Sequence, residues 1–565
     1  MGRVRWAGAL ASVSVLAGAA AAQAQAPAPA APAAGAPRMQ EVFTSMRDGT
    51  KLAANVFLPE GAGPWPVVLT RTPYLKDGRM FAPAGAKKWT DAGYAYVVQD
   101  VRGKGRSTGF YDAFINDIED GYDSVEGLAT QPWSNGKVGI TGGSAMGITS
   151  NLAAVAQPPH LKAAYVIVAP NETFRTSFLG GVPEDKDLVG WLKGQGVKDD
   201  VIRRLQANEV RNVFADRAGP GEAIKYVSIP VWNVGGWYDI FNTGSVENFQ
   251  RLQHEGARGA RGNARLTMGP FGHGDLSGDL AYPGQDRLMA VMGGSGTGKP
   301  NDIRWFDHWL KGEDNGVDQE PPVEAFMMAS ARKGAPSAKN RWIKAADWPL
   351  ANRPVRYYPA KDGGLSTRSP GAAEAKISYR FDPKNPVQTL GGANLTFERG
   401  PMDQRPIKGR GDYLRFQTPV LDRDVAIAGP VQVELYAATD GPDTDFEAKL
   451  VDVYPDGYEA LVLDAPIRAR YRGGRRPDEV RMMTPGAPEK LTIDLWNTAL
   501  TFEKGHRIAL HLTSSNAPRF QVNPNDGSAP GEPGKPRTAT NTVYMDRDHP
   551  TALVLPVVYL DDGAR

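Results

Sequence analysis

Cysteine is absent from all 565 residues, which excludes disulfides, thiolate nucleophiles and cysteine-ligated metal centres. Histidine is scarce at 7 residues, and none of them forms a spaced cluster of the kind that ligates metal ions, so we expect no metal and no cofactor. Excess charge is lacking too: 65 basic and 63 acidic residues leave a net charge of +2, too little to grip nucleic acid. Covalent catalysis would therefore need an oxygen or nitrogen nucleophile.

The first 24 residues have the composition of a secretory signal peptide. Arg3 and Arg5 give a positive start, an apolar run follows, and Ala22-Gln23-Ala24 fits the small-x-small cleavage pattern. The alternative, a retained membrane anchor, is disfavoured because the run is short and rich in Ala and Gly. Residues 25–40 continue as an Ala/Pro-rich linker. We predict a bacterial periplasmic or secreted protein with no membrane attachment after cleavage.

The rest of the chain predicts two architectures. Residues 41–170 and 229–350 hold short apolar runs, several of them separated by helix-length segments, which is typical of a mostly parallel sheet with helices on both faces. Between them, residues 171–228 lack strong strand signals and predict an inserted helical cap. From 351 to 565 apolar and polar residues alternate between turn signals, which predicts a separate antiparallel sandwich.

One stretch predicts a nucleophile. Residues 137–147 read Lys-Val-Gly-Ile-Thr-Gly-Gly-Ser-Ala-Met-Gly, so a short strand ends in two glycines, Ser144 follows, and a helix begins at Ala145. A serine on a sharp strand-to-helix turn needs glycines beside it, because the strained backbone and the adjacent helix leave no room for side chains. The spacing G-x-S-x-x-G departs from the usual G-x-S-x-G, and most Gly/Ser clusters are ordinary turns.

The remainder of the chain strengthens this hypothesis. Asp239 and His273 each lie directly after a predicted strand, and the order Ser144, Asp239, His273 is the chain order of an α/β-hydrolase triad. In such a triad the serine attacks, the histidine acts as general base and then acid, and the aspartate orients the imidazole. The N–H of Ala145 would face the developing oxyanion. Tyr74 follows the first core strand, where a second oxyanion donor belongs, although a surface-turn tyrosine fits the pattern equally well.

A second glycine-rich segment suggests a different chemistry. Residues 293–299 read Gly-Gly-Ser-Gly-Thr-Gly-Lys and match seven positions of a phosphate-binding P-loop. The eighth position should be Ser or Thr, to hold magnesium, and is Pro300, and no apolar strand precedes the segment. We interpret it as a loop without a phosphate site.

Together these motifs resemble the CocE/NonD hydrolases, the group that contains cocaine esterase, α-amino-acid ester hydrolases and glutaryl acylases and is related to X-Pro dipeptidyl-peptidases. The resemblance runs from about residue 40 to the end of the chain. The pieces that match are residues 71–74, 99–103, the Ser144 turn, 236–239, 269–273, 445–456 and 515–525.

The resemblance implies an α/β-hydrolase core with an inserted helical cap, followed by an all-β jelly roll. It also implies Ser144, Asp239 and His273 as the catalytic triad, with Tyr74 and the N–H of Ala145 as the oxyanion hole. Relatives often carry an aromatic residue directly after the serine, so Ala145 makes the pocket wall smaller. Within the second motif we interpret Asp100 and Arg102 as an ion pair that braces their loop.

We therefore expect a serine hydrolase that cleaves small carboxylic esters, with amides as a secondary class, through an acyl-enzyme. Trp191, Phe178 and Trp237 are expected to line the substrate pocket, although Trp191 and Phe178 fit the core of the cap equally well. The sequence does not specify the oligomeric state.

Two alternatives remain open. An X-Pro dipeptidyl-peptidase or α-amino-acid ester hydrolase would need an anionic subsite for a free amino group. Carboxylates for such a subsite exist in the cap at Glu172, Glu184, Asp185 and Asp187, but no motif places them. The second alternative is a non-catalytic protein whose sandwich binds carbohydrate.

Overall fold

The computed structural model describes residues 37–207, 217–285, 299–333, 335–529, 532 and 534–559. The predicted signal peptide, the first part of the linker and all but the last residue of the P-loop-like segment lie outside these ranges. That last residue, Lys299, forms an ion pair with Asp307 at 2.7 Å. Within the described ranges, no helix is long and apolar enough to cross a membrane.

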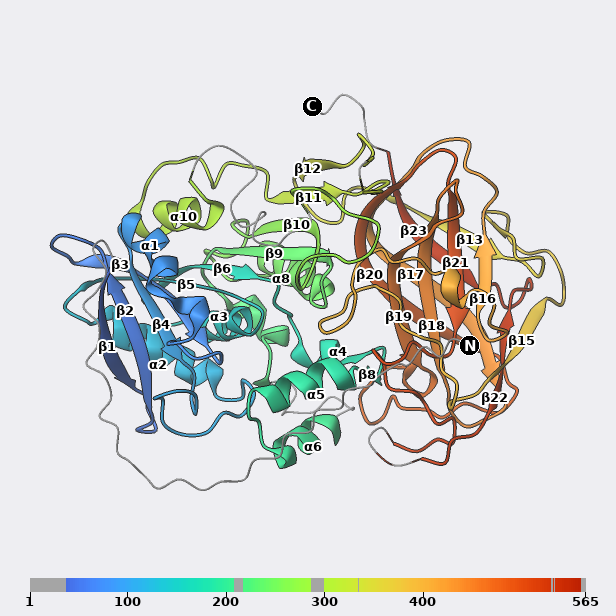
Figure 1. Cartoon of the computed structure of the whole chain (residues 1–565), viewed down its shortest axis with the longest axis horizontal. Coiled ribbons are helices and arrows are strands. Elements are labelled where there is room, and N and C mark those ends of the chain that lie inside the picture. The colour runs from blue at the N-terminus through green and yellow to red at the C-terminus, as the bar shows by residue number, and fades with distance from the viewer. Residues whose placement is uncertain are drawn as a thin grey trace, which may run out of the picture. The chain divides into compact units, whose positions relative to one another are not determined.

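A ten-stranded sheet forms the first architecture, in the order β1-β2-β4-β3-β5-β6-β9-β10-β11-β12 (Figure 1). Strands β4 to β11 in this order are parallel to their neighbours, whereas the β1-β2, β2-β4 and β11-β12 pairs are antiparallel. The first strand begins at Arg38, so the end of the predicted linker is strand. The strands are β1 (Arg38–Ser45), β2 (Lys51–Leu58), β3 (Trp65–Thr72), β4 (Ala95–Asp100), β5 (Ser134–Gly143), β6 (Leu161–Ile167), β9 (Val231–Tyr238), β10 (Arg265–Gly272), β11 (Val323–Met327) and β12 (Arg341–Ala345).

Helices cover both faces of this sheet. Successive side chains of a strand point to opposite faces, and here both faces carry apolar side chains that the helices bury. In β3, Val67 and Leu69 join the apolar cluster under one set of helices, whereas Val68 joins the cluster under the other. The first set is α2 (Asp117–Ala129), α3 (Ala145–Val155) and α8 (Asn242–His254). The second set is α1 (Pro83–Asp91) and α10 (Asn301–Phe306).

The cap after β6 is mainly helical and contains a small hairpin that the sequence did not predict. Two-residue strands carry no periodicity, so β7 and β8 escape pattern reading. At their turn, Gly180 and Gly181 have φ of +55° and +84°. A Cβ on Gly180 would lie 2.0 Å from the carbonyl oxygen of Pro466, so the hairpin packs against sandwich backbone. The described elements are α4 (Thr173–Ser177), β7 (Phe178–Leu179), β8 (Val182–Pro183), α5 (Asp185–Gly194), α6 (Asp199–Ala207) and the 3₁₀ turn η2 (Gly221–Tyr226).

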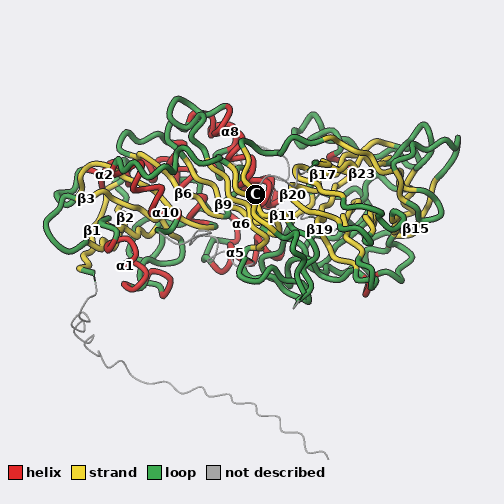
Figure 2. The backbone as a smooth tube through the Cα atoms, turned by 90° about the horizontal axis from the view of Figure 1, so that it is seen from above, coloured by secondary structure: helices red, strands yellow, loops and turns green. Residues whose placement is uncertain are grey.

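The second architecture is a sandwich of a seven-stranded and a four-stranded sheet, antiparallel at every strand pair. Figure 2 shows helices among the strands of the first part and almost only strands and loops in the sandwich. The larger sheet holds β13 (Arg353–Pro359), β14 (Leu365–Ser366), β15 (Lys376–Phe381), β17 (Val425–Thr439), β20 (Glu489–Phe502), β22 (Ala539–Tyr544) and β23 (Ala552–Val558). The smaller holds β16 (Leu414–Gln417), β18 (Asp445–Val453), β19 (Glu459–Arg468) and β21 (Arg507–Thr513).

Candidate active site

Ser144 stands alone between the last residue of β5 and the first of α3, with φ +58° and ψ −125°. A Cβ on Gly142 would lie 2.4 Å from the Cβ of Met146, and one on Gly147 would lie 2.8 Å from the Cβ of Ala169. Gly143 would meet only ordinary contacts, from 3.7 Å. The two positions that need glycine are therefore 142 and 147, which accounts for the unusual spacing of the motif.

The structure brings Ser144, His273 and Asp239 together. The serine Oγ lies 2.8 Å from His273 Nε2, and His273 Nδ1 lies 2.8 Å from Asp239 Oδ2. Asp239 is fully buried, and its other oxygen accepts the N–H of Phe241 at 2.7 Å. Because β5, β9 and β10 are parallel, the turns that follow them lie at one edge of the sheet, where these side chains meet.

Two potential oxyanion donors flank the serine. Ala145 is the first residue of α3, so its N–H has no acceptor within the helix. The Tyr74 hydroxyl accepts the indole N–H of Trp191 at 3.1 Å. Burial raises the pKa of Tyr74, and hydrogen bonds with Trp191 and Ser144 only partly oppose that rise. The phenol therefore keeps its proton at neutral pH and can donate it.

An apolar cavity of about 170 Å³ opens beside these groups. Core, cap and sandwich all contribute to its wall, and Trp191 lines it as the sequence predicts. Six further apolar residues lie in the wall, and sequence reasoning missed them because they come from five separate segments: Phe114, Ile148, Leu188, Ile240, Phe241 and Leu395.

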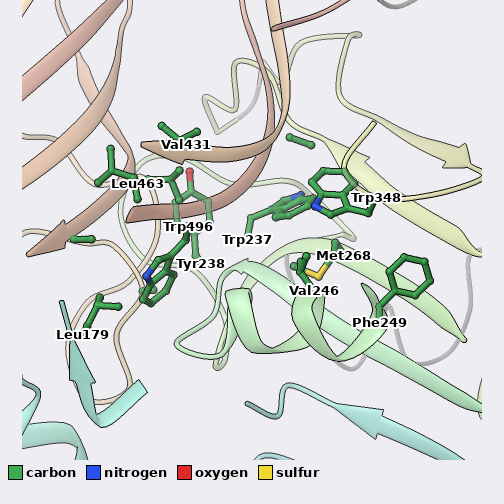
Figure 3. Close-up of a cluster of buried hydrophobic side chains, with 14 of the residues drawn as sticks. Leu179, Trp237, Tyr238, Val246, Phe249, Met268, Trp348, Val431, Leu463 and Trp496 are labelled. Carbon is green, nitrogen blue, oxygen red and sulfur yellow. The ribbon is translucent and has the colours of Figure 1, made fainter. Parts of the chain in front are cut away.

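The predicted pocket roles of Phe178 and Trp237 are wrong. Phe178 is buried in the cap hairpin and is not part of the cavity wall. Trp237 points into the apolar layer between sheet and sandwich, where its ring centroid lies 5.3 Å from that of Trp348 (Figure 3). Its indole N–H donates to the carbonyl of Phe326 at 2.8 Å. Trp237 is close to Asp239 in sequence, but it belongs to strand β9, which is buried along its whole length. Its side chain therefore packs in the core and does not line the pocket.

Two of the four cap carboxylates, Glu184 and Asp187, reach the cavity wall. Glu184 pairs with the buried guanidinium of Arg519 at 3.2 Å, and burial raises its pKa to about 7. Asp187 accepts the backbone N–H groups of Leu395 and Thr396 at 2.9 and 3.1 Å. Glu172 does not line the cavity, and the side chain of Asp185 lies outside the described part. Among the described side chains, no group of three or more His, Asp or Glu could hold a metal ion.

The sandwich also supports the histidine loop. A Cβ on Gly272 or Gly274 would lie 2.8 or 2.6 Å from the side chain of Arg399, so this arginine lies directly against the glycines that flank His273. The N–H of Ser277 donates to the carbonyl of Arg399 at 2.9 Å. Sequence reasoning missed Arg399, because nothing local links it to a loop about 120 residues earlier.

The predicted ion pair between Asp100 and Arg102 is wrong. Arg102 binds Asp120 and Asp48, each at 2.6 Å. Asp100 instead accepts the backbone N–H of Lys76 at 2.6 Å. Asp100 thus braces the segment after Tyr74, and Arg102 braces the turn at Asp48 against α2, through partners too far along the chain for a motif to show.

A mostly parallel sheet whose serine, aspartate and histidine follow the strands β5, β9 and β10 defines the α/β-hydrolase fold, and the protein is a serine hydrolase. Residues 48–210 match the model of the X-Pro dipeptidyl-peptidase S15 family, and residues 315–554 match that of the X-Pro dipeptidyl-peptidase C-terminal non-catalytic domain. Cocaine esterase of Rhodococcus sp. is 30% identical, with 92% of this chain and 98% of the esterase covered. The chain belongs to the CocE/NonD family of serine hydrolases.

Solved structures agree with this membership. An α-amino acid ester hydrolase is 25% identical with a TM-score of 0.76, covering 94% of this chain and 98% of that one. An aminopeptidase from a marine sediment archaeon has a TM-score of 0.81 at 24% identity, covering 95% and 99%, and shows the common fold. Both matches extend over core, cap and sandwich.

Proposed function

We propose that this protein hydrolyses carboxylic esters with a small apolar acyl group, through an acyl-enzyme on Ser144. One observation carries the proposal: the Ser144 Oγ lies 2.8 Å from His273 Nε2 at the mouth of an apolar cavity of about 170 Å³. A cavity of about 150 Å³ in another protein holds a benzene ring, so an acyl group the size of one ring would fit by volume.

In the acylation step, Ser144 Oγ attacks the ester carbonyl carbon while His273 Nε2 takes its proton. The Tyr74 hydroxyl and the Ala145 N–H bind the oxyanion, and the N-terminus of α3 adds a favourable dipole. The carbon–oxygen bond to the alcohol then breaks, and His273 gives its proton to the leaving oxygen. Asp239 holds the imidazole in the orientation that presents Nε2 to the serine.

Deacylation repeats this chemistry with water. His273 takes a proton from a water molecule whose oxygen attacks the acyl carbon, and the same two donors bind the second oxyanion. Collapse breaks the bond to Ser144 Oγ, which regains a proton from His273, and the carboxylic acid leaves. The α-carbon of the acyl group faces the apolar wall throughout.

A second candidate is cleavage of substrates with a free α-amino group, because Glu184 and Asp187 lie in the cavity wall. Relatives named Xaa-Pro dipeptidyl-peptidases and an α-amino acid ester hydrolase belong to this side of the family. However, Glu184 already has a buried guanidinium partner and Asp187 binds two backbone N–H groups. Both carboxylates are thus compensated within the protein, which favours a neutral acyl group.

The test is a panel of 4-nitrophenyl esters with acetyl, butyryl, benzoyl and decanoyl groups, beside amino-acyl esters with free and N-acetylated amines. We expect turnover of the ring-sized and shorter acyl groups, and no preference for the free amine. If kcat/KM for the free-amine ester exceeded that for the N-acetylated ester by more than about tenfold, the result would favour the second candidate. No reaction with a fluorophosphonate would favour the carbohydrate-binding alternative.

The proposed location is the periplasm or the cell exterior. It is supported by the charged start, the apolar run and the small-x-small pattern of residues 1–24. Fractionation of cells that express the full chain, with N-terminal sequencing of the product, tests the proposal. Cytoplasmic protein that retains residue 1 would contradict it.

A further inference from the structure

Trp191 of cap helix α5 contacts Tyr74 of the oxyanion hole. Its indole N–H donates to the Tyr74 hydroxyl oxygen at 3.1 Å, and the two rings meet edge to face with centroids 6.4 Å apart. Its flat face stacks on Phe114 at 5.8 Å and 9°. Phe114 itself has φ +75°, a region that costs energy for a non-glycine residue. The indole is therefore held between two aromatic rings.

This contact decides where the tyrosine proton points. An indole N–H is a donor and offers no acceptor, so the Tyr74 oxygen must accept from Trp191. The proton of Tyr74 cannot then point back at the cap. Tyr74 and Ser144 both line the cavity, so the proton that Trp191 cannot accept is directed into the cavity on the side of the serine. The proton thus points to the place where the carbonyl oxygen of a bound ester develops its charge.

The indole N–H of Trp191 donates to the Tyr74 hydroxyl, whose own proton is then free for the oxyanion, while the Ser144 hydroxyl faces His273 Nε2. Hydrogen bonds that run in one direction polarise each other, by about 10–30% per bond. We infer that Trp191 is a positioning residue of this hydrolase, which orients the Tyr74 hydroxyl toward the oxyanion through its indole N–H. This inference rests on the proposed function.

Because the carbonyl oxygen becomes an oxyanion only after the ester is bound, in the tetrahedral intermediates and the transition states beside them, this role should affect kcat and leave KM unchanged. Trp191 also lines the cavity, and loss of a wall would instead raise KM for bulky acyl groups. The two effects separate with 4-nitrophenyl acetate, whose acyl group is too small to fill the cavity. Trp191→Phe is the informative variant, because it removes the N–H and keeps a ring against Phe114.

A double-mutant cycle with Tyr74→Phe tests the inference. We expect Tyr74→Phe to lower kcat about 10²–10³-fold, the usual effect of losing one oxyanion donor. Trp191→Phe should lower kcat about fivefold, the value of one neutral hydrogen bond, with KM unchanged. In the Tyr74→Phe background, Trp191→Phe should have no further effect. Trp309→Phe is a matched control, because its indole N–H is buried and has no hydrogen-bond partner in the described structure.

An equal loss from Trp191→Phe in both backgrounds would overturn the inference, since the indole would then act independently of the hydroxyl. A rise in KM with unchanged kcat would do the same. Thermal unfolding and fluorophosphonate labelling of each variant show whether fold and nucleophile are intact. If Ser144→Ala retains turnover, the proposed function fails as well. If Ser144→Ala is inactive and Tyr74→Phe retains full kcat, only the inference fails.

Discussion

Asp187 of cap helix α5 accepts the backbone N–H of Leu395, a sandwich residue in the wall of the cavity beside Ser144, at 2.9 Å. Its other oxygen accepts the N–H and the hydroxyl of Thr396. One buried carboxylate thus joins cap and sandwich beside the pocket. Four positions along α5 from this residue lies Trp191, so the same helix anchors both the cavity wall and the contact with Tyr74.

We predict that Asp187→Ala lowers the free energy of unfolding by about 1–3 kcal/mol, because it removes charge-assisted hydrogen bonds. It should also lower kcat/KM for the benzoyl ester by about tenfold, since the wall and the helix lose their fixed spacing. Urea unfolding and steady-state kinetics measure both effects. Asp200→Ala is the control, because Asp200 is an exposed carboxylate of α6 that pairs with the exposed Arg204. Equal effects of the two variants would contradict the prediction.

A second Ser–His–Asp chain lies between core and sandwich, and we predict that it does not react. Ser330 Oγ lies 3.2 Å from His506 Nε2, and His506 Nδ1 lies 2.8 Å from Asp452 Oδ1. The N–H groups of Ser330 and Ala331 could have stabilised an oxyanion, but Glu503 and the Tyr454 hydroxyl accept them.

A fluorophosphonate should therefore label Ser144 alone, and peptide mapping by mass spectrometry identifies the site. Ser144→Ala should abolish labelling and lower kcat by roughly 10⁶-fold, as loss of a triad serine does, with an unchanged unfolding midpoint. Ser330→Ala should keep both labelling and turnover. Label on Ser330 would contradict this assignment.

The two Ser–His–Asp groups, one at Ser144 and one at Ser330, show what the sequence can and cannot predict. The order Ser144, Asp239, His273 points to a site because each residue follows a core strand, and parallel strands end at one edge. The Ser330 chain has no such pattern, since its members come from different domains. The same reason hides Leu395 and Arg399, which reach the site from a loop without periodicity. Local patterns predict strands and turns, whereas contacts between distant loops depend on the packed fold.

His506, the histidine between Ser330 and Asp452, makes the stability of the folded protein depend on pH. Burial disfavours its charged form, but the hydrogen bond and the charge of Asp452 outweigh burial and raise its pKa, and Glu503 and Asp456 act in the same direction. A histidine with a raised pKa in the folded state stabilises the protein fully below its unfolded pKa of about 6.5. This contribution is lost as pH rises through the folded pKa.

Between pH 6 and pH 9, about the range in which histidines titrate, the free energy of unfolding should fall in both proteins. We predict that it falls by more in the wild type than in His506→Gln. Glu184, with a pKa of about 7 in the folded protein, contributes a fall in the same direction between about pH 4.5 and 7, since its raised pKa favours the protonated form. Urea unfolding across this range in both proteins isolates the histidine part. Parallel curves would show that His506 does not contribute.

The glycine requirement at the elbow predicts a sharp difference between neighbours. Gly147→Ala would place a Cβ 2.8 Å from the Cβ of Ala169 and 3.0 Å from the carbonyl oxygen of Ile167, whereas a Cβ on Gly143 would meet Ile167 at 3.7 Å. We expect Gly147→Ala to cost about 1–3 kcal/mol of stability by overpacking and to lower kcat. Gly143→Ala should change the unfolding midpoint little. Similar midpoints for the two variants would refute the packing explanation.

The cavity wall should set the acyl preference. Leu188 and its neighbour Val189 on α5 both pack against one apolar cluster, but only Leu188 of the two also lies in the cavity wall. Leu188→Ala enlarges the apolar space. In a hydrophobic pocket, one extra or missing methylene of the substrate changes the discrimination between two substrates by about 10–200-fold. We therefore expect the decanoyl-to-butyryl ratio of kcat/KM to rise about tenfold, by the same rule, while Val189→Ala leaves the ratio unchanged. A ratio that moves equally in both variants would place the acyl group elsewhere, because only Leu188 borders the cavity.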